Sequence, residues 1–174
     1  MAFLRGPGMD LKTEGARTLL AYWESQKGNS RLPSTTDLDL VDLAPILSNM
    51  VIYEHGESDF TTRFFGTEMV RRLGVDLTGT KTSAFTDQPF GKLIIDHLTQ
   101  VIDGPTMRAL EYHSQTNEGP VLEIEHIMLP WANEKGEAQC VLSHIIRTSG
   151  EDATLTLKLE ESFISLVNLQ TVSL

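Results

Sequence analysis

The feature that most constrains this chain is an alternating strand pattern, followed at once by two glycines that bracket a short helical pattern. Residues 60–65 alternate as the two faces of a half-buried strand do, and Gly66 interrupts the alternation. An apolar helical face follows, whose first turn Thr67 can cap and which Gly74 can end in the left-handed conformation. Gly79 marks a further reversal. The stretch predicts a strand, a short helix and two sharp turns, although an ordinary connection from a strand to a helix has the same pattern.

The other periodic segments predict the order of the elements. Residues 50–53 are apolar on both faces, which is typical of a strand covered on both sides. Pro89 opens the longest helical pattern, which Gly104 ends. In chain order we expect a helix over 16–27, a tight turn or short helix over 37–47, strands over 49–54 and 60–65, a helical turn over 82–88, a helix over 89–103, and strands over 106–116, 121–131 and 138–148.

The last two strands can be aligned by their side chains. Of two plausible registers, one places Met128 opposite Leu142, so that apolar side chains meet apolar ones and opposite charges also meet. The same register places His126 opposite His144. We therefore expect the two histidines to share one face of the sheet.

The two ends of the chain have weaker patterns. Residues 1–15 contain an early Gly-Pro-Gly and are expected to be a flexible leader, followed by one domain over 16–150. Residues 151–174 begin with alternating leucines and continue with apolar residues at helical spacing, so the two patterns conflict. We expect this stretch to be a loosely attached tail, or a segment that becomes ordered against a partner chain.

Charge and composition exclude several classes of function. Fourteen basic residues against 24 acidic ones give a net charge of −10, which repels phosphate backbones and anionic lipids. We therefore expect no nucleic acid and no membrane among the partners, and no segment has the apolar length of a membrane span. The single cysteine, Cys140, excludes an internal disulfide, and the N-terminus lacks the apolar segment of a signal peptide. These features predict a cytoplasmic protein.

Four groups of residues occur in an order that is specific when they are taken together. They are Tyr22-Trp23; Leu32-Pro33 followed by Asp37-Leu38-Asp39 and Leu43-Ala44-Pro45-Ile46-Leu47; Phe65-Gly66-Thr67-Glu68-Met69-Val70 with Asp76-Leu77-Thr78-Gly79; and Leu122-Glu123 through Leu129-Pro130. With the order of elements, they make the chain resemble the stand-alone PAS-domain family of alphaproteobacteria, formerly a domain of unknown function. The resemblance implies an α+β fold with a five-stranded antiparallel sheet, helices over one face and an N-terminal flanking helix.

The resemblance also implies a function. It implies a sensory or signalling module that acts through small-molecule binding, protein–protein interaction or both, and it implies no catalytic residues. Such a module, with no output domain of its own, passes its signal on by association. We expect a homodimer anchored by Tyr22 and Trp23 on the outer sheet face, and a signalling protein such as a kinase or cyclase as a further partner.

The alternation of the predicted elements also indicates which side chains would line an internal binding pocket for an unknown small molecule. The candidates are Phe64, Met69, Phe85, Leu93, His97, Leu110, Tyr112, His126, Met128, Leu142 and His144.

Three sensing chemistries can be compared with the sequence. Flavin photochemistry of the PAS type needs a reactive cysteine on a helix, whereas Cys140 lies in a predicted strand. Haem needs an axial histidine from the long helix, where His97 lies at the border of the apolar face, but no arginine is evident on the inner strand face to hold the propionates. His126 and His144 could sense a metal or a proton, but no further ligands can be named, and a structural role explains the pair more simply. The cofactor is therefore unknown, with haem through His97 as one alternative, and no metal site is predicted.

Enzyme motifs are absent from the sequence, which has no nucleophile elbow, zinc-protease helix, phosphate-binding glycine loop or dinucleotide fingerprint. Glu111, Glu123 and Glu125 alternate along predicted strands, a pattern that usually indicates a solvated sheet face. The alternative to a sensor is a small α+β enzyme that uses a buried histidine and a carboxylate in the central cavity.

Overall fold

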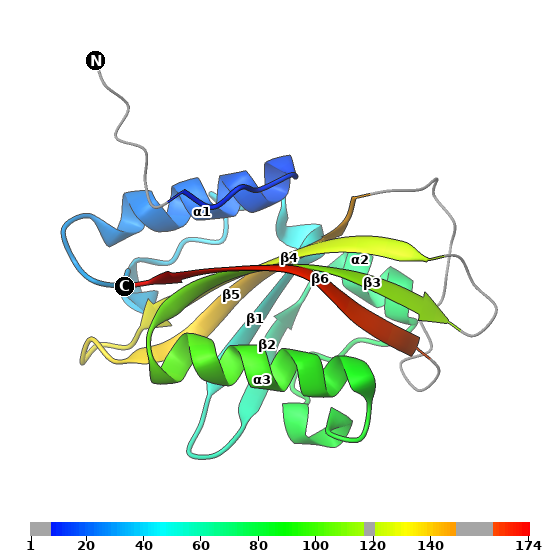
Figure 1. Ribbon diagram of the computed structural model, residues 1–174. Coiled ribbons are helices and arrows are strands. Elements are labelled where there is room, and N and C mark those ends of the chain that lie inside the picture. The colour runs from blue at the N-terminus through cyan, green and yellow to red at the C-terminus, as the bar shows by residue number, and fades with distance from the viewer. Residues whose placement is uncertain (1–7, 117–120, 149–161) are drawn as a thin grey trace.

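The computed structural model describes residues 8–116, 121–148 and 162–174, which form one antiparallel sheet between helical layers (Figure 1). The six strands lie in the order β2-β1-β5-β4-β3-β6. Their bounds are β1 Met50–His55, β2 Phe60–Phe65, β3 Thr106–Thr116, β4 Leu122–Ala132, β5 Ala138–Arg147 and β6 Ser162–Ser173. The expected α+β architecture is confirmed, with six strands in place of five.

Helices cover the sheet on both faces (Figure 1). On the outer face lies α1 (Glu14–Lys27), and on the inner face lie α2 (Thr67–Leu73), the 3₁₀ turn η3 (Thr82–Phe85) and α3 (Pro89–Asp103). Two further 3₁₀ turns, η1 (Thr35–Asp37) and η2 (Leu47–Asn49), lead into β1. Each face has its own apolar core.

The strand β1, which lies between β2 and β5, is buried on both faces, as its sequence predicted. Val51 and Tyr53 belong to the inner core, while Met50 and Ile52 belong to the outer core. A strand with apolar side chains on both faces can be stable only where both faces are covered, and the helices supply this cover.

The glycines around α2 have two different roles. Gly74 ends the helix in the left-handed conformation with φ of 71°, as expected, and its N–H donates to the Val70 carbonyl. The N-cap position is held by Gly66 without a side-chain bond, so the predicted cap by Thr67 is wrong. A Cβ at Gly66 would lie 2.4 Å from the Ser48 carbonyl oxygen, so the glycine lets α2 begin directly against η2.

The predicted register between β4 and β5 is wrong by one residue. Met128 lies opposite Ser143, and Leu142 lies opposite Leu129. Next to the connecting loop, Ala132 lies opposite Ala138, which is the pair that the predicted register also gives at this position. A bulge then follows between Trp131 and Ala132, and it shifts every later pair by one. Side chains in β5 that were expected on the inner face therefore lie on the outer face.

The described part of the expected tail is a strand of the sheet. β6 pairs with β3 along the whole length of β3, from Thr106 to Thr116 (Figure 1). The expectation of a loosely attached tail is therefore wrong for residues 162–173, because their backbone groups complete the edge of β3. Residues 149–161 lie outside the described residues.

The N-terminal segment also departs from its expectation. Leu11 is buried in the outer core, and α1 starts two residues earlier than predicted, at Glu14, with the Thr13 side chain as its cap. Residues 9–13 are therefore held against the sheet, while residues 1–7 lie outside the described residues.

Among the described helices, none combines the length and the apolar character needed to cross a membrane.

Candidate functional site

The inner face of the sheet contains a small cavity beneath the N-terminal half of α3. Its volume is about 40 Å³, which is space for about three water molecules at 10–15 Å³ each. It is lined mainly by apolar side chains from β1, β2, β5, α2, η3 and α3. They are Tyr53, Thr62, Phe65, Met69, Leu73, Leu77, Thr82, Phe85, Gln88, Phe90, Gly91, Ile94, Ile95 and Ile145.

Two local contacts shape the wall of this cavity. At Gly91, a Cβ would lie 1.9 Å from the Phe85 carbonyl oxygen, so α3 can cross η3 closely only because this residue is glycine. Asp59, immediately before β2, holds η3 in place: its carboxylate accepts bonds from the Thr82 hydroxyl at 2.8 Å and the Ser83 hydroxyl at 2.6 Å. Burial alone would raise the pKa of Asp59, but the bonds from Ser83, Thr82 and the backbone outweigh it and lower the pKa.

A row of buried polar side chains lies on the same face, on β3, β4 and α3. Arg108 on β3 donates a hydrogen bond from Nη1 to Nδ1 of His97 on α3, and both side chains are only 7% exposed. His126 on β4 and Tyr112 on β3 follow, with ring centroids 6.4 Å apart. The Arg108 Nε, the Tyr112 hydroxyl and both ring nitrogens of His126 are buried and have no hydrogen-bond partner among the described residues. Buried polar groups normally have partners, so these atoms indicate a site that could accept a ligand or water.

Burial keeps the histidines of this face neutral near pH 7. The pKa of His126 falls to about 3, mainly because of burial and to a smaller extent because of the neighbouring His97 and His144. The pKa of His97 is also lowered, first by burial and then by the Arg108 charge. His97 therefore accepts the bond from Arg108 as a neutral imidazole.

His126 and His144 do not face each other, contrary to expectation. Because of the bulge, His126 lies opposite Ile145 and points to the inner face, while His144 lies opposite Ile127 and points to the outer face. There its ring packs closely on Gly15 of α1, where a Cβ would lie 2.3 Å from the ring. The two histidines cannot form a joint metal or proton site on one face.

The structure divides the predicted pocket residues into three groups. Met69 and Phe85 line the cavity. Leu93, His97, Leu110, Tyr112, His126 and Met128 lie on the inner face outside the cavity lining. Phe64, Leu142 and His144 lie on the outer face, which corrects their expected inward position.

Sequence reasoning missed most of the residues that border this cavity. Phe90, Ile94 and Ile145 are apolar and match the helical or strand periodicity, so the pattern could have indicated them once the register of β5 was known. Arg108 was missed because a charged residue in a strand suggests a solvated face. Its burial on the inner face corrects the expectation that no arginine lies there.

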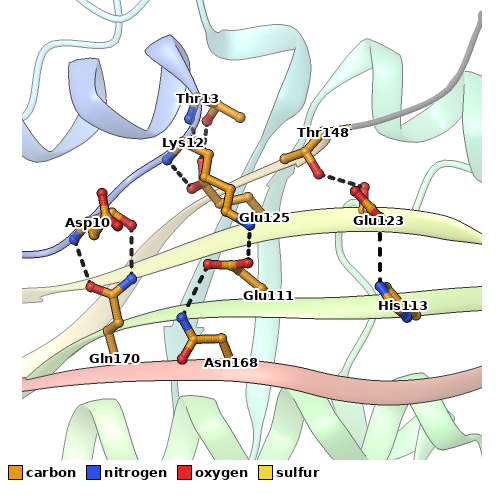
Figure 2. Close-up of polar contacts among 10 residues, drawn as sticks. All are labelled: Asp10, Lys12, Thr13, Glu111, His113, Glu123, Glu125, Thr148, Asn168 and Gln170. Atoms are coloured by element: carbon orange, nitrogen blue, oxygen red, sulfur yellow. Dashed lines mark hydrogen bonds and ion pairs between the residues drawn. The ribbon is translucent and has the colours of Figure 1, made fainter.

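The outer face carries a second polar network, which ties the N-terminal segment to the sheet (Figure 2). The Glu125 carboxylate is 1% exposed and accepts bonds from the backbone N–H of Lys12 at 2.6 Å and of Thr13 at 3.0 Å, and from the Thr13 hydroxyl. The alternation of Glu125 with its neighbours predicted a solvated sheet face. This prediction is wrong for Glu125, because its side chain is buried. Lys12 forms an ion pair with Glu111, and this bond lowers the pKa of the glutamate.

The same network reaches β6. The Asn168 side chain donates to Glu111 at 3.2 Å, and Gln170 exchanges two hydrogen bonds with the backbone of Asp10 (Figure 2). We call the contacts of residues 10–13 with Glu111, Glu125 and Gln170 the N-terminal clasp. It connects the start of α1 with β3, β4 and β6.

The size of the cavity and the position of Cys140 can be compared with the requirements of haem, flavin and metal sensing. A cavity of about 40 Å³ is far below the roughly 300–1,000 Å³ of typical ligand pockets, so a haem or flavin would have to displace α3. Cys140 lies in β5, and burial raises the pKa of its thiol to about 11, which disfavours the reactive thiolate. No cluster of three metal-binding side chains occurs within the described ranges.

The arrangement expected for the alternative enzyme is not formed at this cavity. The described residues that line it include no carboxylate. The buried Glu125 lies on the outer face, whereas His126 lies on the inner face. His126 and this carboxylate therefore cannot act together at the cavity.

The type of domain is shown by a comparison with protein families. The sequence profile of the PAS domain family matches residues 11–146. Among solved structures, the chain is similar to a variant of Vivid (VVD), with 15% identity and a TM-score of 0.48 over 85% of this chain and 100% of that one. It is also similar to the PAS domain of BvgS from Bordetella pertussis, with 12% identity and a TM-score of 0.42 over 66% of this chain and 90% of that one. No curated protein sequence matches it.

Proposed function

The chain belongs to the PAS domain family, a family of sensory modules, and from this premise we propose that it senses a small molecule at the inner-face cavity and signals by association with other proteins. The observation that carries the proposal is the apolar cavity beneath α3, together with the adjoining row of buried polar atoms that have no partner among the described residues. Neither feature stabilises the fold, because a void loses packing contacts and an unpartnered buried polar group is unfavourable. Both are expected of a binding site.

The signal has a physical route from the cavity to the outer face. Ligand binding would press on α3 and on the inner side of β5, because both contribute to the lining. The opposite side of the sheet carries α1 and the N-terminal clasp. A small change in sheet twist would therefore alter the packing of α1 on the outer face. This would change the outer surface that a partner protein could bind. The cytoplasmic location and a kinase or cyclase as recipient remain part of this proposal.

The test uses xenon, an apolar probe small enough for the cavity. In NMR spectra of the wild type, we expect saturable amide shifts at cavity residues such as Ile145, together with shifts at Lys12 and Thr13 in the clasp. Ile94→Phe fills the cavity and should abolish both sets of shifts. Ile102→Phe, on α3 but outside the lining, is the control and should retain them. Shifts confined to the cavity would show a mere packing void and would contradict a sensory role.

For association, we propose a homodimer in which two copies meet along β6. β6 is an end strand of the described sheet, and residues 162–174 contain no charged side chain in a protein of net charge −10. Leu166, Val167 and Leu169 on this strand are 44%, 55% and 38% exposed. Edge strands are normally protected by charges, so an uncharged apolar edge suits pairing with a second copy of the same strand.

The anchors expected from the sequence do not support this dimer. Trp23 is 1% exposed and donates to the Pro130 carbonyl within its own chain at 2.7 Å. Tyr22 stacks on Trp131 with ring centroids 5.9 Å apart. Both side chains hold α1 on its own sheet, which corrects their predicted role as dimer contacts.

Sedimentation equilibrium at micromolar concentration tests the dimer. We expect the wild type to be a dimer and Leu166→Lys/Leu169→Lys to be a monomer, because lysines on an edge strand oppose strand pairing. Val41→Lys, at a 77% exposed position outside β6, should leave the dimer intact. A monomeric wild type would exclude this interface.

A further inference from the structure

Arg108 is a buried positive charge without a counter-charge in the part of the chain that the structure describes. The one hydrogen bond of its guanidinium within the described residues goes to His97, which is neutral, and Nε has no partner. Among these residues no carboxylate lies within ion-pair distance of Arg108. Arginine remains protonated even where burial lowers its pKa, so the charge is present and unneutralised.

Such an arrangement is unfavourable for the free protein. Buried charges in proteins are normally paired, and a buried charge without its partner destabilises the folded state strongly. The chain nevertheless places the guanidinium on the inner face, on the same side of the sheet as the cavity. This is the arrangement expected of a site that acquires its anion from a ligand.

The neighbouring side chains extend this site along the sheet. Leu110 lies opposite His126, and Arg108 and Tyr112 lie two residues to either side of Leu110 on β3. Alternate residues of a strand share a face, so Arg108, His126 and Tyr112 form one row. Within the described ranges, His126 and Tyr112 each retain hydrogen-bonding atoms without a partner. A neutral imidazole and a phenol can each donate one hydrogen bond to an anion.

The far end of this row meets the cavity. The Tyr112 ring contacts Phe90, a cavity residue, with centroids 6.3 Å apart. Ile145, also in the lining, is the cross-strand neighbour of His126. The polar row and the apolar cavity therefore adjoin beneath α3.

We propose that this inner face binds a small carboxylic acid with an apolar chain, its carboxylate held by Arg108 and the neighbouring His126, and its chain directed past Tyr112 to the cavity. This rests on the sensory function proposed above and names the class of ligand for it. The chain enters as α3 moves outward, because the present cavity holds only about three waters.

Calorimetric titration at constant ionic strength tests the class of ligand with three probes: hexanoate, its neutral analogue hexanamide, and acetate. We expect hexanoate to bind the wild type at least tenfold more tightly than either of the others. Arg108→Met should weaken hexanoate binding at least tenfold, while Arg63→Met, at a 60% exposed side chain on β2, should not change it.

Thermal unfolding without ligand gives a second readout that a structural arginine would not share. Arg108→Met removes an unneutralised buried charge and keeps an apolar chain of similar length, so its unfolding temperature should equal or exceed that of the wild type. A lower unfolding temperature combined with unchanged hexanoate affinity would overturn the proposal.

The remaining outcomes separate this proposal from the sensory function. Equal affinity for hexanoate and hexanamide would exclude the acid but leave a sensor of neutral ligands. Equal affinity for hexanoate and acetate would exclude the use of the cavity by the chain. If hexanoate does not bind at millimolar concentration the acid proposal fails, whereas the xenon experiment decides independently on the sensory function.

Discussion

Three buried histidines show how strongly position determines protonation in this protein. The pKa of His126 falls to about 3 and that of His144 to about 4, in each case mainly through burial. Arg72 adds to the effect at His144, and Arg108 adds to it at His97. All three imidazoles are therefore neutral near pH 7.

These shifts predict a loss of stability on acidification. The unfolded chain takes up a proton at each histidine near pH 6.5, whereas the folded chain takes it up only at lower pH, so the free energy of unfolding falls as the pH drops below 6.5. Each fully shifted histidine contributes a slope of about 1.4 kcal/mol per pH unit. For His126 this slope continues to about pH 3.

Denaturant titrations between pH 7 and 5 measure the slope. His126→Leu should remove about one histidine's share of it, while His113→Gln, at a side chain that is 44% exposed, should leave it unchanged. An identical slope in His126→Leu and the wild type would show that the burial of His126 does not control the pH dependence.

At the scale of the elements, the contact between α3 and η3 determines the shape of the cavity. The sequence predicted both elements, since Pro89 opens a long amphipathic pattern and a helical turn precedes it. The distance between α3 and η3 could not be predicted from the sequence, because it depends on how closely the backbone of Phe85 in η3 approaches Gly91 in α3. η3 is also bound to the β1–β2 hairpin, because the Thr82 and Ser83 hydroxyls donate hydrogen bonds to the Asp59 carboxylate.

Substitution of Gly91 should therefore reverse the usual effect of alanine in a helix. Gly→Ala within a helix normally stabilises by about 1 kcal/mol. Here the added Cβ would meet the backbone of Phe85, so we expect Gly91→Ala to destabilise the protein by about 1–3 kcal/mol in denaturant titrations. Gly104→Ala is the control, because a Cβ added there would meet no atom within 4 Å. If Gly91→Ala is more stable than the wild type, η3 can shift to accommodate the added Cβ, and the prediction is wrong.

At the scale of the whole molecule, the sheet separates two faces with different structural features. The inner face holds the cavity and the polar row, and the outer face holds α1 and the N-terminal clasp. β6 extends this sheet by an uncharged edge on a strongly acidic protein. We therefore expect electrostatic repulsion between two copies to be weakest when they meet along β6.

The proposed dimer should consequently become tighter as salt is added. Raising the ionic strength from about 0.01 M to 0.15 M shortens the Debye length from roughly 30 Å to 8 Å, which screens the repulsion between two acidic copies and leaves apolar contacts intact. Sedimentation equilibrium at the two ionic strengths measures this. A dimer that weakens with salt would indicate an interface of opposite charges and not one along β6.

Much of this architecture could be predicted from the sequence by itself. The bounds of β2, β3 and α3 follow from local periodicity and from the residues that end each pattern, and they agree with the structure. The two-sided burial of β1 was also predictable, because its residues are apolar on both faces. Local patterns are sufficient for such features, since each depends on residues that are adjacent in the chain.

The tertiary structure decided which side chains meet. A bulge of one residue near Ala138 turned Leu142 and His144 to the outer face, and the pairing of β6 with β3 gave a strand to a segment with conflicting patterns. The burial of Arg108 beneath α3 was decided in the same way. Contacts of this kind depend on the offset between distant strands and on the packing of a helix over them, and neither quantity is encoded in the periodicity of any single segment.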